Sequence, residues 1–384
     1  MGLRVKIFLL AILFVFLFVQ CKSHNLNKDE ISAQMQQVAD WQIEHFEYAE
    51  TGSAGYLHDY GIDAWTNGVL YIGMGDWAKI AKNNPKYYDW LYNIGEKASW
   101  AIPRNFADDP RYATRYGLYH ADELCVGQFY LEMYDVYIEQ KMVTSTKERL
   151  DWIMENPPLD EMRANNKQKW SWCDALFMAA PVYLRLASIE KDDKYIEFMH
   201  KEFMDTYNHL YDKEAGLFFR DSYYFEKREQ NDEKVFWGRG NGWVVAAVAQ
   251  VLKHLPQNSP YRPFYENLFV ELTVRLLELR NDNGFWHASL LDPESYPSPE
   301  TSATALITYA LAYGVNNQLL DAKKYIPEIE KSWNALISVI DENGKLGYVQ
   351  PIGADPRSVT EDMTAVYGIG AFLMAGSEIY QIAK

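Results

Sequence analysis

The 384-residue sequence is poor in cysteine, in basic residues and in long hydrophobic runs. Beyond Cys21 only Cys125 and Cys173 remain, so no disulfide framework holds the fold and its stability must come from its core. We expect both cysteines to be reduced and buried. Basic residues number 37 against 53 acidic ones, and the net charge of −16 argues against nucleic acid and anionic membrane surfaces as partners.

Several chemical signatures are also missing. The eight histidines show no paired helical spacing, so we expect no metal site, and no cofactor is expected either. No serine stands in a recognisable nucleophile elbow, and no glycine-rich segment ends in the Lys-Ser/Thr pair of a phosphate loop. We therefore do not expect a metalloenzyme, a serine hydrolase with a nucleophile elbow or an enzyme with a phosphate-binding loop.

Aromatic side chains, in contrast, are abundant. The chain has 12 Trp, 28 Tyr and 18 Phe, which together make 15% of its residues. Flat rings stack on sugar faces while their polar edges form hydrogen bonds, so this composition fits a protein that handles sugars. For any single ring, filling a helical core is the simpler interpretation.

The N-terminus has the pattern of an export signal. Arg4 and Lys6 precede 13 apolar residues, 7–19, which are too few to span a bilayer and suit the hydrophobic region of a signal peptide. Because Cys21 follows directly, residues 1–21 resemble a bacterial lipoprotein signal with Cys21 as the lipidated residue. Gln20 departs from the small residue expected before that cysteine, which leaves ordinary secretion open. We expect an exported protein, periplasmic or membrane-anchored, of a Gram-negative bacterium.

Apolar residues recur at helical spacing along nearly the whole chain. The pattern predicts twelve helices, beginning near residues 28, 63, 85, 120, 144, 173, 192, 240, 260, 301, 321 and 362, and a β-hairpin around residues 216–226. Long and short connections alternate, as in six helical hairpins. We therefore predict an all-α fold, an (α/α)6 barrel, formed as a single catalytic domain over residues 26–384. An open helical-repeat solenoid is the alternative.

In such a toroid all long loops lie at one end, where polar residues at the starts of the inner helices converge. The candidates are Asp63, His120, Asp122, Trp172, Asp174, Trp237, Arg239, His287, Glu300, Thr301, Tyr348 and Asp362. Helix capping is the simpler interpretation of Asp63, Thr301 and Asp362.

Asp174 is the best candidate for a general acid. It follows Trp170 and Trp172 and opens an apolar helix, so its carboxylate is poorly solvated and its pKa should be raised. Asp122, on the preceding inner helix, can supply a second carboxylate, and the two can act as an acid/base pair.

The densest motif is Trp-Gly-Arg-Gly-Asn-Gly-Trp at residues 237–243. Its glycines permit close approach of a ligand to the backbone. Trp237 can stack on a sugar, and Arg239 can bind a carboxylate through two parallel hydrogen bonds. A glycine-rich helix entry with structural indoles is the alternative.

Five segments, residues 63–68, 121–127, 172–178, 237–243 and 300–305, together resemble glycoside hydrolase family 105, which is close to family 88. These families are the unsaturated uronyl hydrolases, and their fold is an (α/α)6 barrel. The resemblance implies that Asp174 protonates carbon 4 of a 4,5-unsaturated uronate and activates water, with Asp122 assisting. It also implies that Trp172, Trp237 and Arg239 line the uronate subsite, and we add His120 and Thr301 as substrate-binding candidates.

One position departs from the family pattern. Many relatives carry histidine where this chain has Arg220, within Gly-Leu-Phe-Phe-Arg at residues 216–220. A fixed positive charge there favours a more acidic substrate, such as an ulvan fragment with unsaturated glucuronate on sulfated rhamnose. Pairing of Arg220 with Asp221 or another carboxylate is the alternative.

We interpret the chain as a hydrolase that removes unsaturated glucuronyl or galacturonyl groups from rhamnose-containing oligosaccharides of the ulvan or rhamnogalacturonan type. Its substrate is an unsaturated oligosaccharide, so it acts downstream of a polysaccharide lyase. The alternatives are a conventional inverting glycosidase or lyase on the same fold, and a non-catalytic glycan-binding lipoprotein.

Overall fold

The computed structural model describes residues 26–47, 61–102, 116–157, 162 and 169–384. The predicted signal peptide, with Cys21, lies outside these residues. In the described part of the chain are twelve helices of 12 to 17 residues, the four-residue helix α4 (Tyr116–Tyr119) and the short 3₁₀ helix η3 (Ser222–Tyr224). None of these helices combines the length and the hydrophobicity needed to cross a bilayer.

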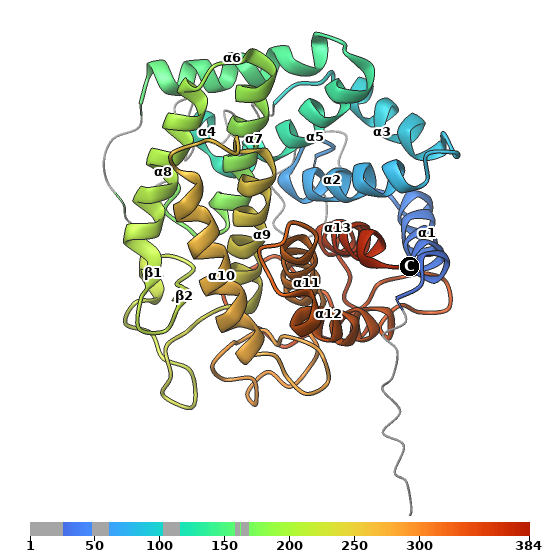
Figure 1. Ribbon diagram of the computed structural model, residues 1–384, viewed down its shortest axis with the longest axis vertical. Helices are drawn as coiled ribbons and strands as arrows, with labels where there is room; N and C mark the ends of the chain where they lie inside the picture. The colour runs from blue at the N-terminus through green and yellow to red at the C-terminus, as the bar shows by residue number, and fades with distance from the viewer. Residues whose placement is uncertain (1–25, 48–60, 103–115, 158–161, 163–168) are drawn as a thin grey trace, which may run out of the picture.

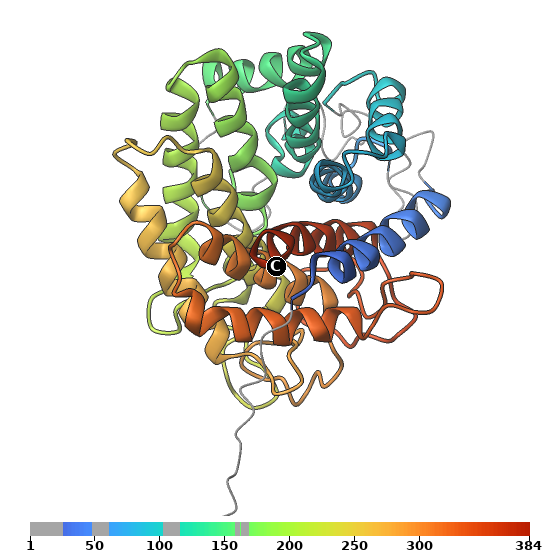
Figure 2. The same ribbon diagram turned by 45° about the vertical axis from the view of Figure 1, so that its right-hand side comes forward.

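The helices form two concentric rings (Figures 1 and 2). The inner ring consists of α2 (Trp65–Ile80), α5 (Ala121–Tyr137), α7 (Ala175–Glu190), α9 (Gly238–His254), α11 (Thr301–Asn316) and α13 (Val366–Ile382). The outer ring consists of α1 (Lys28–Glu44), α3 (Lys86–Lys97), α6 (Lys141–Glu155), α8 (Lys194–Leu210), α10 (Arg262–Glu278) and α12 (Ala322–Ile337). Each inner helix packs against the next, and α13 packs against α2, which closes the ring. The (α/α)6 barrel is confirmed, and the open solenoid is wrong.

Burial distinguishes the two rings. In α2, 13 of 16 residues are buried, whereas only 6 of 16 are buried in the outer helix α12. Small residues allow the inner helices to pack closely: a Cβ atom on Gly73 of α2 would overlap the carbonyl oxygen of Gly370 in α13. The closure of the ring therefore depends on two glycines that face each other.

The predicted helix starts agree with the structure, with the largest offsets at α6 and α13, which begin at Lys141 and Val366. The predicted hairpin is displaced. The two strands are β1 (Tyr211–Asp212) and β2 (Leu217–Phe218), paired antiparallel with Tyr211 opposite Phe218. Gly216, with φ of +67°, lies in the turn between them, because a left-handed residue suits a reversal. Residues 222–224 form η3 instead of a strand.

Cys125 and Cys173 are both buried and unpaired, as predicted. The chain ends beside α1, where the backbone amide of Lys384 donates to the carbonyl of Leu26. Both ends of the described chain therefore meet at the outer ring.

Candidate active site

The predicted site residues gather at the N-terminal ends of the inner helices. Asp122 lies in the first turn of α5, Asp174 directly precedes α7, and Arg239 lies in the first turn of α9. Thr301 is the first residue of α11. Because α5, α7, α9 and α11 are consecutive neighbours in the ring, these side chains lie along one rim of the barrel.

Asp174 lies against the start of α7 with 8% of its surface exposed. Burial raises the pKa of this carboxyl, and the positive charges of Arg220 and Arg239 oppose the shift without cancelling it. The Sγ of Cys173 donates to Oδ2 of Asp174 at 3.6 Å. The predicted direction of the pKa shift is confirmed, with burial as its largest cause. No helix amide uses the carboxylate as a cap.

Arg220 lies between two carboxylates. Its Nε is 3.5 Å from Oδ2 of Asp174, and its Nη1 donates to Oδ2 of Asp221 at 2.5 Å. Backbone pairing sets this geometry: the amide of Cys173 donates to the carbonyl of Arg220, and Trp172 and Asp221 form an antiparallel bridge. The alternative that Arg220 pairs with neighbouring carboxylates is confirmed, so its charge is already shared.

His120, Asp122 and Trp172 lie together on the α5 side of Asp174. His120 caps α5, with Nδ1 accepting from the amide of Asp122 at 3.2 Å. The same nitrogen is 3.8 Å from Oδ2 of Asp122. The centroids of the His120 and Trp172 rings are 5.0 Å apart. Trp172 and His120 are buried, whereas the Asp122 side chain keeps 24% of its surface exposed. The more accessible carboxylate is therefore that of Asp122.

Trp237 and Arg239 are almost completely buried, and both bind Gln350. Nε1 of Trp237 donates to Oε1 of Gln350 at 3.1 Å, and Nη1 of Arg239 donates to its carbonyl oxygen at 2.5 Å. Nη2 of Arg239 donates to the carbonyl of Pro351 at 2.9 Å, and the guanidinium lies 4.4 Å from the Trp237 ring centroid. These bonds anchor the loop before α13. A direct ligand role for Trp237 and Arg239 stays a prediction.

Arg239 nevertheless brings charge to the site. Among the described residues, no carboxylate lies within 4 Å of its guanidinium, and its buried Nε has no hydrogen-bond partner. Carbonyl dipoles solvate the ion but do not neutralise it. Within the described residues, the site therefore contains a positive charge without a carboxylate partner, close enough to oppose the rise in the pKa of Asp174.

The expected caps at Asp63, Thr301 and Asp362 are wrong. Helices α2 and α13 begin after Ala64 and Ala365, with no side-chain cap, and α11 is capped by Glu300. The hydroxyl of Thr301 instead donates to the carbonyl of Gly347 at 2.7 Å. The longer Glu300 side chain reaches the amides of Ser302 and Ala303 and also that of Gln350. A substrate contact of Thr301, which is fully buried, stays a prediction.

Three residues near the site were not predicted. Gln350 joins Trp237 to Arg239, and its carbonyl also accepts the hydroxyl of Tyr367. Glu123 follows Asp122 in α5 and is buried; burial, with Asp63 nearby, raises the pKa of Glu123 well above its usual range. No motif surrounds Gln350, whereas Tyr367 stands within the predicted helix start at residues 362–368 and Glu123 within the segment 121–127, where both could have been found.

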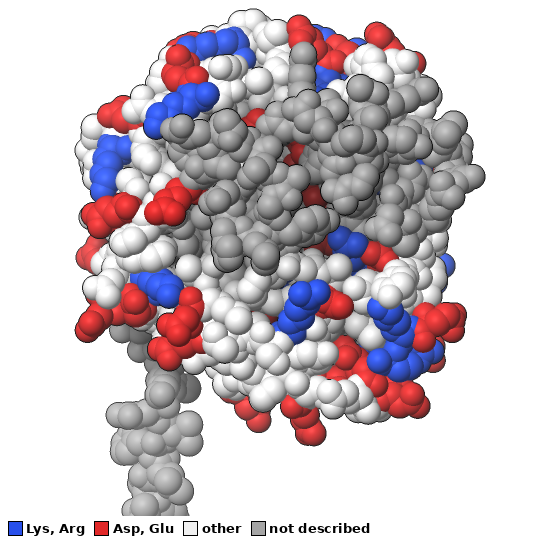
Figure 3. All heavy atoms as spheres, turned by 180° about the vertical axis from the view of Figure 1, so that it is seen from behind, with Lys and Arg blue, Asp and Glu red and all other residues white. Residues whose placement is uncertain are grey.

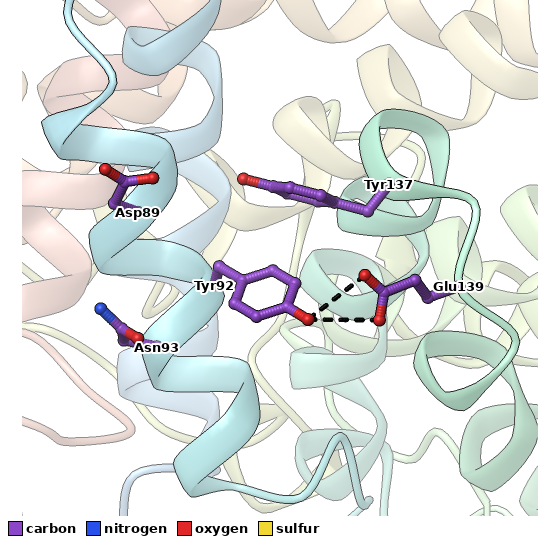
Figure 4. Close-up of a pocket in the computed structure, with 5 residues that line it drawn as sticks. All are labelled: Asp89, Tyr92, Asn93, Tyr137 and Glu139. Atoms are coloured by element: carbon purple, nitrogen blue, oxygen red, sulfur yellow. Dashed lines mark hydrogen bonds between the residues drawn. The ribbon is translucent and has the colours of Figure 1, made fainter.

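A cavity in the described structure lies away from these residues. It measures about 470 Å³ and is lined by residues of α3 and by Tyr137 and Glu139 at the end of α5 (Figure 4). The Tyr92 hydroxyl donates to both oxygens of Glu139 at 3.2 Å, and Lys141 lies 2.8 Å from the same carboxylate. None of the predicted site residues lines this cavity, so it is not the candidate site.

The chain matches known proteins along most of its length. The family model of Glycosyl Hydrolase Family 88 matches residues 34–383. A protein of Formosa agariphila named unsaturated 3S-rhamnoglycuronyl hydrolase is 38% identical over 376 residues, which cover 94% of this chain and 93% of the relative. A protein of the same name from Alteromonas sp. (strain LOR) is 33% identical, covering 89% of this chain and 83% of the relative.

Solved structures agree with the sequence comparison. A glycosyl hydrolase family 88 protein from Bacteroides vulgatus superimposes with a TM-score of 0.80 at 30% identity, over 92% of this chain and 99% of that protein. Its similarity therefore extends over the whole double ring.

Proposed function

The chain belongs to glycosyl hydrolase family 88, and from this membership we propose that it removes an unsaturated uronate from a sulfated, rhamnose-containing oligosaccharide. The relation to the unsaturated uronyl hydrolases is confirmed, and the protein is a glycoside hydrolase acting on unsaturated oligosaccharides. The names of these relatives, unsaturated 3S-rhamnoglycuronyl hydrolase, support rhamnose beside the uronate, and the sulfate is our proposal.

The proposed mechanism rests on one observation: the carboxyl of Asp174 is buried, and burial raises its pKa. In its protonated form Asp174 donates a proton to carbon 4 of the 4,5-double bond. Water then adds its oxygen to carbon 5 and returns a proton to the carboxylate, so one water is added in all. The resulting hemiketal opens to a ketone at carbon 5, and carbon 1 becomes an aldehyde as the next sugar leaves with a free hydroxyl.

The surrounding residues fit roles in this reaction. Asp122, partly exposed and close to His120, can orient the attacking water. The positive charge of Arg239 attracts the uronate carboxylate into the site. Trp172, buried against His120, forms part of the wall on the α5 side. Arg220 stabilises the ionised form of Asp174 that follows proton transfer, because its Nε lies 3.5 Å away.

The double bond of the substrate indicates which kind of enzyme produces it. A 4,5-unsaturated uronate arises when a polysaccharide lyase cleaves a uronate chain by elimination, so we place this enzyme after such a lyase. The N-terminal signal pattern supports export, and we propose Cys21 as the site of a lipid anchor. Mass spectrometry of the N-terminal peptide from cells tests this: a diacylglyceryl-cysteine would support the anchor, and an unprocessed Met1 would contradict export.

Loss of the unsaturated-uronate absorbance tests the function. Wild-type protein should consume lyase-digested ulvan oligosaccharides and leave the undigested, saturated polymer unchanged. Asp174→Asn should abolish turnover without unfolding the protein. Burial raises the pKa of Asp174 above its value in the unfolded chain, so ionisation at neutral pH opposes folding; the variant should melt at an equal or higher temperature. Near-normal turnover by Asp174→Asn would contradict the assignment.

A further inference from the structure

A second cavity, of about 240 Å³, is lined partly by residues that follow the Arg220–Asp221 pair in the chain. Its lining includes Tyr224, Lys227, Arg228, Glu229, Tyr296 and Asp355, and we call it the Lys227 cavity. Tyr224 is the last residue of η3, which begins directly after Asp221. A 3₁₀ helix rises about 2.0 Å per residue, so Tyr224 lies about 6 Å along the helix from Asp221, the residue that pairs with Arg220.

A second link ties the cavity to the buried Trp237 and Arg239. Nε2 of Gln350 donates to the carbonyl of Asp355 at 2.9 Å, while Oε1 of the same side chain accepts from Trp237. The Lys227 cavity and the candidate site are therefore neighbours across two separate chain segments. Because the second sugar of an oligosaccharide lies beside the first, the neighbouring cavity is a candidate for binding it.

The two cations of the Lys227 cavity have no counter-ion within the described residues. No carboxylate lies within 4 Å of Lys227 or Arg228, whereas nearby Lys234 lies 2.7 Å from Asp212. The Lys227 ammonium lies 3.4 Å from the centroid of the Tyr223 ring and 4.7 Å from that of Tyr224. Arg228 uses Nη1 for the carbonyls of Phe225 and Lys227. Two positive charges thus remain for a bound anion.

The two carboxylates of the cavity do not cancel this charge. Asp355 accepts from Nε of Arg357 at 3.0 Å, which leaves it paired. Glu229 accepts from the hydroxyl of Ser289 at 2.7 Å, and burial raises its pKa. Their remaining lone pairs can accept sugar hydroxyls, and the partly exposed ring of Tyr296 offers a flat apolar face. The lining therefore suits an anionic sugar rather than a free anion.

We propose that the Lys227 cavity binds the sulfated sugar next to the uronate, with Lys227 and Arg228 holding the sulfate. This rests on the proposed function and extends it to the leaving side of the substrate. Both side chains donate charge-assisted hydrogen bonds to a permanent anion. Arg220, the residue from which sequence reasoning expected sulfate recognition, already shares its charge with Asp174 and Asp221.

The test compares two unsaturated disaccharides, one with rhamnose 3-sulfate and the same one after desulfation. In the Lys227→Ala, Arg228→Ala double variant, kcat/KM for the sulfated disaccharide should fall by about 10- to 100-fold, mainly through KM, the range expected for lost hydrogen bonds to a charged group. The desulfated disaccharide should be hydrolysed as by wild type. Lys213→Ala, which removes an exposed lysine from the β1–β2 turn, is the matched control and should resemble wild type with both substrates.

An equal loss for both disaccharides, or no loss for either, would overturn the proposal. A binding measurement distinguishes failure of the sulfate-subsite proposal from failure of the proposed function. Saturation-transfer NMR with rhamnose 3-sulfate should show binding to wild type and to Lys213→Ala but not to the double variant. If this holds while neither disaccharide is hydrolysed, the function fails and the sulfate subsite stands. If both disaccharides are hydrolysed and the double variant still binds rhamnose 3-sulfate, the subsite fails alone.

Discussion

The contact between Arg220 and Asp174 predicts how the pH dependence of turnover responds to mutation. Turnover by the proposed mechanism needs the protonated form of Asp174, so activity should decline as pH rises through its pKa. Arg220 stabilises the ionised carboxylate. Arg220→Gln removes that stabilisation, raises the pKa of Asp174 further and should move the alkaline limb of the kcat/KM profile to higher pH.

The distance sets the scale of the effect. At 3.5 Å and an effective dielectric constant of about 20, Coulomb's law gives about 5 kcal/mol between two unit charges. That value is an upper limit, because Nη1 of Arg220 is also bound by Asp221 at 2.5 Å. Since 1.36 kcal/mol corresponds to one pH unit, losing about a third of the attraction already moves the alkaline limb by about one unit.

Asp221→Asn provides a test of opposite sign. It removes a negative charge near Asp174 and releases Arg220 to interact with Asp174 alone, so the alkaline limb should move to lower pH. The asparagine keeps an oxygen for the amide of Tyr223, which Asp221 now binds at 2.8 Å, so η3 should persist. Arg275→Gln, which removes a cation from outer helix α10, is the control and should not shift the limb.

The assay is kcat/KM for the sulfated disaccharide measured across the pH range in which each variant remains folded by circular dichroism. The reasoning is refuted if Arg220→Gln leaves the alkaline limb in place or moves it to lower pH. It is also refuted if Arg220→Gln and Asp221→Asn shift the limb in the same direction. A decrease in activity without any shift would mean that Arg220 does not act through the ionisation of Asp174.

Three further predictions concern stability. Lys169→Ala should lower the free energy of unfolding by about 3–5 kcal/mol, because the Lys169 side chain is 1% exposed and lies 2.9 Å from Glu202 and 2.8 Å from Asp205. Lys201→Ala should lower it by about 1 kcal/mol or less, because Lys201 pairs with the same carboxylates but is 58% exposed. Gly370→Ala should cost about 1–3 kcal/mol or more in urea unfolding, since the new Cβ meets the α2 backbone, whereas Gly353→Ala, with no atom nearer than 3.4 Å, should be nearly neutral. Glu300→Ala should cost about 0.5–2 kcal/mol for the lost cap and also lower kcat/KM, because Gln350 loses a backbone partner.

Each stability prediction has an outcome that would contradict it. Equal effects of the two lysine substitutions would mean that burial does not govern the ion pairs of Glu202. A Gly370→Ala variant as stable as Gly353→Ala would mean that α2 and α13 can move apart without cost. Full activity in Glu300→Ala would mean that the loop carrying Gln350 is held by other contacts.

Figure 3 shows charged side chains of both signs interspersed on the face opposite to that of Figure 1. Among the described residues seen there, no extended patch of a single sign stands out. The net charge of −16 therefore does not say where an anionic substrate binds, and we propose that local groups such as Arg239, Lys227 and Arg228 decide it.

The sequence by itself determined the double ring. Helical periodicity, alternating loop lengths and small residues at the inner helix starts are local properties, and the structure reproduces them as twelve helices around a closed centre. It also indicated the direction of the pKa shift at Asp174, because the carboxyl directly precedes the apolar helix α7 and its burial is the largest cause of the shift.

Only the tertiary structure decided which charges are free. Gln350 binds Trp237 across 113 positions, and Glu300 binds the amide of Gln350 across 50, so no local pattern reveals either contact. Arg220 pairs with Asp221 and Asp174, while Lys227 and Arg228, unremarkable in the sequence, line a cavity and have no carboxylate within 4 Å among the described residues. The physical reason is that a charge takes its role from the groups that folding places within a few ångströms of it.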